Sequence, residues 1–150
     1  MIGPIEARIQ VLSRPTLLAV VRHAIEAWCE LATDDPATCS RVGLAVDEAI
    51  TNVIRHGYRG DDDGIIEISM QRDGSTIGFI IEDRASQVPL EHIKGRDLDD
   101  IRPGGLGVHL IREVMDEAVW SHRDGGGMRL ELTKDLSAAV AKLVEADDER

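Results

Sequence analysis

The fold is decided by residues 47–57, which read Asp-Glu-Ala-Ile-Thr-Asn-Val-Ile-Arg-His-Gly. Glu48 and Asn52 are four residues apart inside an apolar helical pattern, so their side chains lie on one face, one turn apart. A carboxylate can accept a proton from a hydroxyl, and an amide oxygen can ligate a hard metal ion. The pair therefore suits magnesium–nucleotide chemistry.

The same helix has a simpler interpretation, in which Glu48 and Asn52 face solvent. Apolar residues form the opposite face and are expected to pack on a core. Taken alone, the spacing favours the solvated face, so other segments must decide between the two interpretations. The apolar positions are Val42, Val46, Ala49, Ile50 and Val53.

Length and charge restrict the class of protein. The chain has 150 residues, and residues 1–150 are long enough for one domain with a core of its own. Only 3% of the residues are aromatic, so the core must be mainly aliphatic. A formal charge of −11 argues against nucleic acid or an anionic membrane as a direct partner, and it permits a basic protein partner.

Cysteine usage and the absence of a leader pattern indicate a compartment. Cys29 and Cys39 have neither metal-ligand spacing nor the spacing of a disulfide framework. The sequence shows no signal peptide and no apolar run of the roughly 20 residues that span a bilayer. We therefore expect buried, reduced thiols in a cytoplasmic protein.

Hydrophobic periodicity predicts the order β-α-α-β-β-α-β-β-α, with a long loop before the third helix. Because the strands come in hairpins, we expect an α+β fold, a two-layer α/β sandwich. Its sheet is expected to be mixed but mostly antiparallel, with helices on one face. The expected strands are residues 6–12, 65–72, 76–82, 118–122 and 128–133, and the expected helices are residues 13–31, 36–56, 105–116 and 135–145.

Two further segments carry chemistry. Asp83 ends an apolar strand and can accept a hydrogen bond from an amine such as adenine N6, although a lone aspartate there is more often a turn residue. Residues 103–110, Pro-Gly-Gly-Leu-Gly-Val-His-Leu, place glycines at a helix start, where backbone N–H groups can approach an anion. The loop of residues 83–104 before this helix is long enough to act as a nucleotide lid.

In this order and spacing, the segments resemble the Bergerat ATP-binding fold (GHKL, HATPase_c) shared by DNA gyrase, Hsp90, histidine kinases and MutL. The similarity covers nearly the whole chain and is closest to the bacterial anti-sigma-factor serine/threonine kinases. One departure supports that branch. The usual Asp-x-Gly-x-Gly is here Asp-Arg-Ala-Ser-Gln, residues 83–87, without either glycine.

The resemblance implies a role for each matching residue, with ATP and Mg²⁺ as cofactors. Glu48 matches the catalytic base and Asn52 the magnesium ligand, while Asp83 matches the carboxylate that binds adenine N6. The remaining matches surround the phosphates: Arg55, His56, Gly105, Leu106, Gly107 and Val108.

The resemblance also implies an activity and partners. Such a protein is an anti-sigma factor that binds a sigma factor, phosphorylates an anti-anti-sigma protein of the STAS type in a partner-switching system, and forms a homodimer. The altered sequence after Asp83 leaves an alternative open, a nucleotide-binding partner-switching module with little or no kinase activity.

Overall fold

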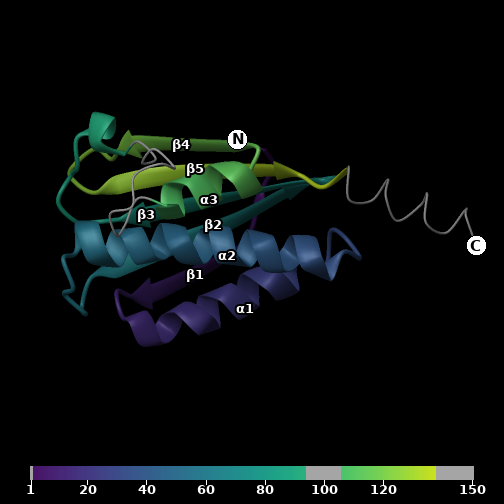
Figure 1. Cartoon of the computed structure of the whole chain (residues 1–150), viewed down its shortest axis with the longest axis horizontal. Coiled ribbons are helices and arrows are strands. Elements are labelled where there is room, and N and C mark those ends of the chain that lie inside the picture. The colour runs from purple at the N-terminus through teal and green to yellow at the C-terminus, as the bar shows by residue number, and fades with distance from the viewer. Residues whose placement is uncertain (1, 94–105, 138–150) are drawn as a thin grey trace, which may run out of the picture.

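The computed structural model describes residues 2–93 and 106–137, in which a five-stranded sheet carries α-helices on one face (Figure 1). The strand order is β1-β2-β3-β5-β4, and each of these four neighbouring pairs is antiparallel. The predicted α+β two-layer sandwich is confirmed. The strands are β1 (Ile5–Leu12), β2 (Ile65–Asp73), β3 (Thr76–Asp83), β4 (Glu117–His122) and β5 (Met128–Asp135), and the helices are α1 (Leu18–Cys29), α2 (Pro36–Asn52) and α3 (Leu106–Val114).

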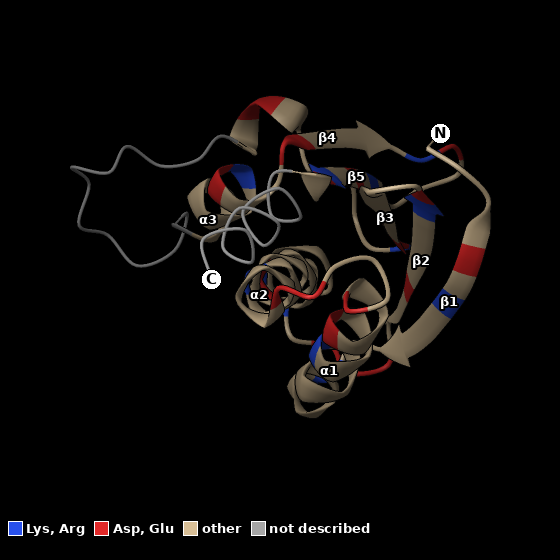
Figure 2. Ribbon diagram, turned by 90° about the vertical axis from the view of Figure 1, so that its right-hand side faces the viewer, with Lys and Arg blue, Asp and Glu red and all other residues tan. Residues whose placement is uncertain are grey.

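Viewed along the layers, all three helices lie on the same side of the curved sheet (Figure 2). Local signals set where the elements begin. Asp35 caps α2, since its carboxylate accepts hydrogen bonds from the backbone N–H groups of Ala37 and Thr38, and Pro36 occupies the first helical position. No helix in the described part of the chain is both long and apolar enough to cross a membrane.

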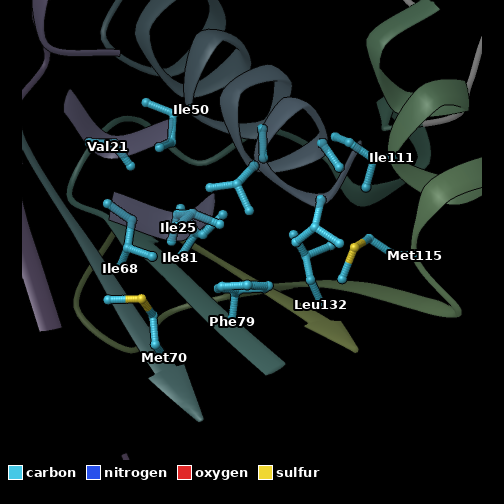
Figure 3. Close-up of a cluster of buried hydrophobic side chains, with 14 of the residues drawn as sticks. Val21, Ile25, Ile50, Ile68, Met70, Phe79, Ile81, Ile111, Met115 and Leu132 are labelled. Atoms are coloured by element: carbon cyan, nitrogen blue, oxygen red, sulfur yellow. The ribbon is translucent and has the colours of Figure 1, made fainter. Parts of the chain in front are cut away.

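The core lies between the sheet and the helices and is mainly aliphatic, as the composition predicts (Figure 3). Phe79 of β3 and Trp28 of α1 are both buried in this core, and their rings meet edge-on at 5.5 Å between centroids. Cys29 and Cys39 are buried free thiols, as expected. Burial raises the pKa of both thiols, which keeps them protonated.

Several predicted boundaries are wrong. The first helix opens with a 3₁₀ turn, Pro15–Leu17, before α1. The second changes at Asn52 into a π-helix, Val53–Gly57. The third ends two residues early at Val114, because the backbone N–H of Asp116 already donates to Thr133 O at the sheet.

The sequence predicts the start of the last helix, at residue 135, too early. β5 continues through Asp135, which pairs with Thr76 of β3, and the next residue, Leu136, is fully buried. The pairing of β5 with β3 therefore continues beyond the end of the alternating polar and apolar pattern from which residues 128–133 were predicted as a strand. The rest of that predicted helix, residues 138–145, lies outside the described residues.

Candidate functional site

Glu48 lies one turn before the end of α2, half-buried, on the side that faces α3. A Cβ atom added to Gly107 would lie only 2.6 Å from Glu48 Oε2. A side chain at Gly107 would therefore require the Glu48 carboxylate to move. The first turn of α3 and the proposed catalytic carboxylate are in direct contact.

Asn52 is the last residue of α2, one turn beyond Glu48, and it is also half-buried. The chain then widens into the π-helix Val53–Gly57, where the backbone N–H of Tyr58 donates to Val53 O at 2.9 Å. Such π-turns are frequent at functional sites. Within the described ranges, the side chains of Asn52, Arg55 and His56 make no hydrogen bond or ion pair, so they are available to a ligand.

Asp83 ends β3 with only 3% of its surface exposed. Its Oδ1 accepts hydrogen bonds from the backbone N–H of Ala85 at 2.9 Å and of Met128 at 3.2 Å. Burial raises the pKa of Asp83 above its ordinary value, while these two amides and the charge of Arg123 oppose that shift. No donor among the described residues reaches Oδ2, which leaves this atom free to accept from an exocyclic amine.

The end of α2 and the π-helix after it connect the surroundings of Glu48 with those of Asp83. A Cβ atom at Gly57 would lie 3.0 Å from the Cβ of Ala85, so the end of the π-helix packs on the residues that follow Asp83. Glu48 lies one turn before Asn52, the last residue of α2, and the π-helix continues from there to Gly57. The candidate site therefore follows the last turn of α2 and the π-helix after it, with Gly107 beside Glu48 and the segment after Asp83 beside Gly57.

The remaining predicted residues are placed only in part. Leu106 is the first residue of α3, whereas Gly105 lies outside the described residues. The side chain of Val108 is buried, so its backbone N–H is the group that can face a phosphate. Residues 94–104 of the expected lid also lie outside the described residues.

Sequence reasoning missed the residues that surround Asp83. Arg123 and Gln87 contact its strand end and the segment that follows. Their only signal in the sequence is the run Gly125–Gly127 between two expected strands, which by itself predicts no more than the turn of a hairpin. A contact between residues 40 positions apart leaves no trace in local periodicity.

The donor set suits a metal ion that arrives with its ligand. Among residues 2–93 and 106–137, no group of three or more His, Cys, Asp or Glu side chains is placed to hold a metal ion alone. Magnesium is commonly held by one or two protein ligands together with phosphate and water oxygens. The amide of Asn52, half-buried and without a protein partner in the described part, fits that pattern.

Residues 11–134 match the family of the histidine kinase-like ATPase domain. Because that match spans most of the chain, this protein belongs to the histidine kinase-like ATPase domain family. Within the family, it is similar to proteins named serine-protein kinase RsbW. The predicted membership of the ATP-binding kinase family is thereby confirmed.

Two of these relatives show the extent of the similarity. The chain is 26% identical over 125 residues to RsbW of Listeria monocytogenes, which covers 78% of this chain and 80% of the relative. It is 32% identical over 100 residues to RsbW of Staphylococcus aureus, with 61% of this chain and 62% of the relative covered.

Solved structures support the fold. The RsbU and RsbW domains of Rv1364c from Mycobacterium tuberculosis superpose with a TM-score of 0.61 at 20% identity, over 86% of this chain and 31% of that one. The histidine kinase domain of the blue-light activated kinase EL346 from Erythrobacter litoralis gives 0.53 at 20% identity, over 82% of this chain and 61% of that one.

Proposed function

We propose that this chain is an ATP-dependent serine/threonine kinase and anti-sigma factor of a partner-switching system. It holds a sigma factor, and it phosphorylates a STAS-type anti-anti-sigma protein. The observation that carries the proposal is the contact between Glu48 and Gly107, which places a carboxylate against the helix start expected to face phosphates. The alternative, a nucleotide-binding module without transfer, does not require a carboxylate at this position.

The nucleotide lies along α2 with its base at Asp83. The free Oδ2 of Asp83 accepts a hydrogen bond from adenine N6. The phosphates lie at the start of α3, where Leu106, Gly107 and Val108 offer backbone N–H groups and the helix dipole favours negative charge. We assign the same role to Gly105 from the family resemblance alone.

Charge at the phosphates is balanced from the other side by the end of α2. Arg55 and His56 are exposed on the π-helix and can approach the phosphate oxygens. Asn52 would hold the magnesium ion through its amide oxygen. When bound, Mg²⁺ neutralises phosphate charge that the strongly acidic chain would otherwise repel.

Glu48 acts on the acceptor hydroxyl. Its carboxylate accepts the hydroxyl proton as the oxygen forms a bond to the γ-phosphorus, while the bond from that phosphorus to the β–γ bridging oxygen breaks and ADP leaves. Most of the rate enhancement comes from positioning and charge neutralisation. Gly107 contributes by letting the carboxylate lie close to the phosphate-facing turn.

We further propose that residues 1–150 act as one domain and form a homodimer.

The net charge of −11 favours protein partners with basic surfaces, since long-range attraction raises the rate of encounter.

Incubation with γ-labelled ATP, Mg²⁺ and candidate STAS-type proteins tests the proposal. Label is expected on a serine or threonine of one partner, and removal of Mg²⁺ with EDTA is expected to abolish it. Tight ATP binding without label on any candidate would favour the binding-module alternative. Absence of nucleotide binding would contradict both functions.

A further inference from the structure

The side chain of Arg123 bridges the end of β3 and the turn between β4 and β5. Its Nη1 donates a hydrogen bond to the backbone oxygen of Asp83 at 2.7 Å, and its Nε lies 3.0 Å from Glu82 Oε2. The Arg123 and Glu82 side chains are 30% and 21% exposed, so this ion pair is partly shielded from water. One guanidinium thus contacts both residues that end the strand.

The backbone of the same turn fits closely against Asp83. Gly127 has φ +90°, and an added Cβ would lie 2.0 Å from Asp83 O, so no other residue fits there without displacing the turn. The next residue, Met128, donates its backbone N–H to Asp83 Oδ1. The turn therefore contacts the carbonyl and the carboxylate of one residue.

The segment after Asp83 is fastened to this turn as well. Gln87 Nε2 donates to the backbone oxygens of Arg123 at 2.9 Å and of Gly127 at 3.3 Å. At the end of β4, His122 Nε2 lies 2.7 Å from Val88 O. Residues 84–88 contain no glycine, and these side-chain bonds hold the segment in its path.

We propose that Arg123 is a positioning residue for recognition of the base, because it holds Asp83 so that Oδ2 stays free and directed at the exocyclic amine of adenine. The inference rests on the proposed function, in which Asp83 binds that amine. Without Arg123, the carbonyl of Asp83 and the carboxylate of Glu82 lose a shared cationic partner. The turn can then shift away, and the amide of Met128 that fixes Oδ1 moves with it.

The test compares ATP with inosine triphosphate, whose base carries a carbonyl oxygen in place of the amine. The affinity ratio of the two nucleotides reports the bond to Oδ2, because both share the sugar and phosphates. In Arg123→Gln, affinity for ATP measured by calorimetry is expected to fall roughly 10-fold to 100-fold, the range for a hydrogen bond to a charged group. Affinity for inosine triphosphate should remain unchanged, so the ratio approaches one.

Arg129→Gln is the matched control. Arg129 also pairs with Glu82, at 3.6 Å, and with Glu131, at 2.7 Å, but it makes no contact with Asp83. Its variant should keep the wild-type ratio. Arg123→Lys keeps the charge with a single ammonium in place of the planar fork, so it should recover only part of the preference for ATP.

Gln87→Ala provides a second route if Arg123→Gln does not fold, since it loosens the same turn without removing a charge. It should lower the ratio in the same direction. A wild-type ratio in both Arg123→Gln and Gln87→Ala would overturn the role of Arg123 while leaving the proposed function intact. Equal wild-type affinity for the two nucleotides, or no binding of either, would instead overturn the proposed function at Asp83 and this inference together.

Discussion

The two ends of the proposed nucleotide site are built differently. At the adenine end, Arg123 donates to the backbone oxygen of Asp83, and the Tyr58 hydroxyl accepts from the backbone N–H of Arg84. Gln87, in the segment after Asp83, donates to the backbone oxygen of Arg123. At the phosphate end, Glu48 and Asn52 have no hydrogen-bonding partner among the described residues. In the proposed function, the protein would organise the group that binds the base before ligand arrives, whereas the ligand and its metal ion would complete the phosphate end.

This difference has an energetic reason. A buried carboxylate that must bind one amine gains affinity when its position is fixed in advance. Groups that act on a transferring phosphoryl must instead leave room for phosphate oxygens, magnesium and an incoming hydroxyl. Substitutions at the phosphate end should therefore change ligand binding and chemistry, while those at the adenine end should also change stability.

The largest effect is expected from Asn52→Ala at the phosphate end. Removing the amide removes the proposed protein ligand of Mg²⁺, so magnesium-dependent ATP affinity should fall below detection by calorimetry. Thermal stability without nucleotide should change little, since Asn52 is half-buried and unpaired in the described part. Unchanged affinity in the presence of Mg²⁺ would show that Asn52 is not the ligand.

Asp83→Asn tests the adenine end by replacing one carboxylate oxygen with an NH₂ group. Asn can still accept at Oδ1 but presents an NH₂ group where the adenine amine must be accepted. ATP affinity should fall roughly 10-fold to 100-fold, the loss expected for one hydrogen bond to a charged group. Wild-type affinity in this variant would place adenine elsewhere.

The pH dependence of Asp83 has a definite sign. Burial raises its folded pKa, so the folded state holds the proton more tightly, and stability falls as the pH rises through the interval up to that raised pKa. At neutral pH, Asp83→Asn should therefore be as stable as wild type or more so. Wild-type ATP affinity should fall as the pH is lowered through the raised pKa, and the variant should lose this dependence.

A pair of glycine variants tests how closely the β4–β5 turn must approach Asp83. Gly125 and Gly127 both have positive φ, of +84° and +90°, but an added Cβ has open space at Gly125 and meets Asp83 O at Gly127. Both alanine variants carry the same backbone strain. Gly127→Ala should lose a further 1–3 kcal/mol, as an order of magnitude, in denaturant unfolding. Equal losses would mean that the turn adapts freely.

Tyr58→Phe should give the smallest effect. The hydroxyl donates to Ile65 O and accepts from the backbone N–H of Arg84, and both bonds are lost. The free energy of unfolding should fall by about 1–2 kcal/mol, since each bond contributes about 1 kcal/mol. Urea unfolding measures this, and an unchanged midpoint would mean that Tyr58 does not hold the segment after Asp83.

The strands and helices could be predicted because their signals are local. The alternation in residues 65–82 and the cap at Asp35 act over a few neighbours, and the structure follows them. The π-helix after Asn52 was not predicted, and its last residue, Gly57, packs against Ala85 from a segment that is distant in the sequence. Local propensity does not distinguish that turn from a continued α-helix.

The candidate site was predictable only where residue types form a motif. Glu48 and Asn52 are suggested by spacing, and the family resemblance links them to Asp83 and Gly107. Arg123 belongs to no motif, and its contact with Asp83 depends on strand pairing that brings β3 and the β4–β5 turn together. The structure was therefore needed to connect recognition of the base with that turn.

Glu48→Gln measures the central claim most directly, because it separates binding from chemistry in one variant. Gln keeps the size and hydrogen-bonding reach of Glu but cannot take the proton of the acceptor hydroxyl. ATP affinity and sigma-factor binding should remain near wild type.

Transfer of label from ATP to the anti-anti-sigma protein should fall by roughly 10²-fold to 10⁴-fold, the contribution of a general base. Calorimetry and the labelling rate are measured on the same preparation, so a folding defect would appear as lost affinity. The account predicts intact binding with this loss of transfer. Transfer at the wild-type rate would contradict it.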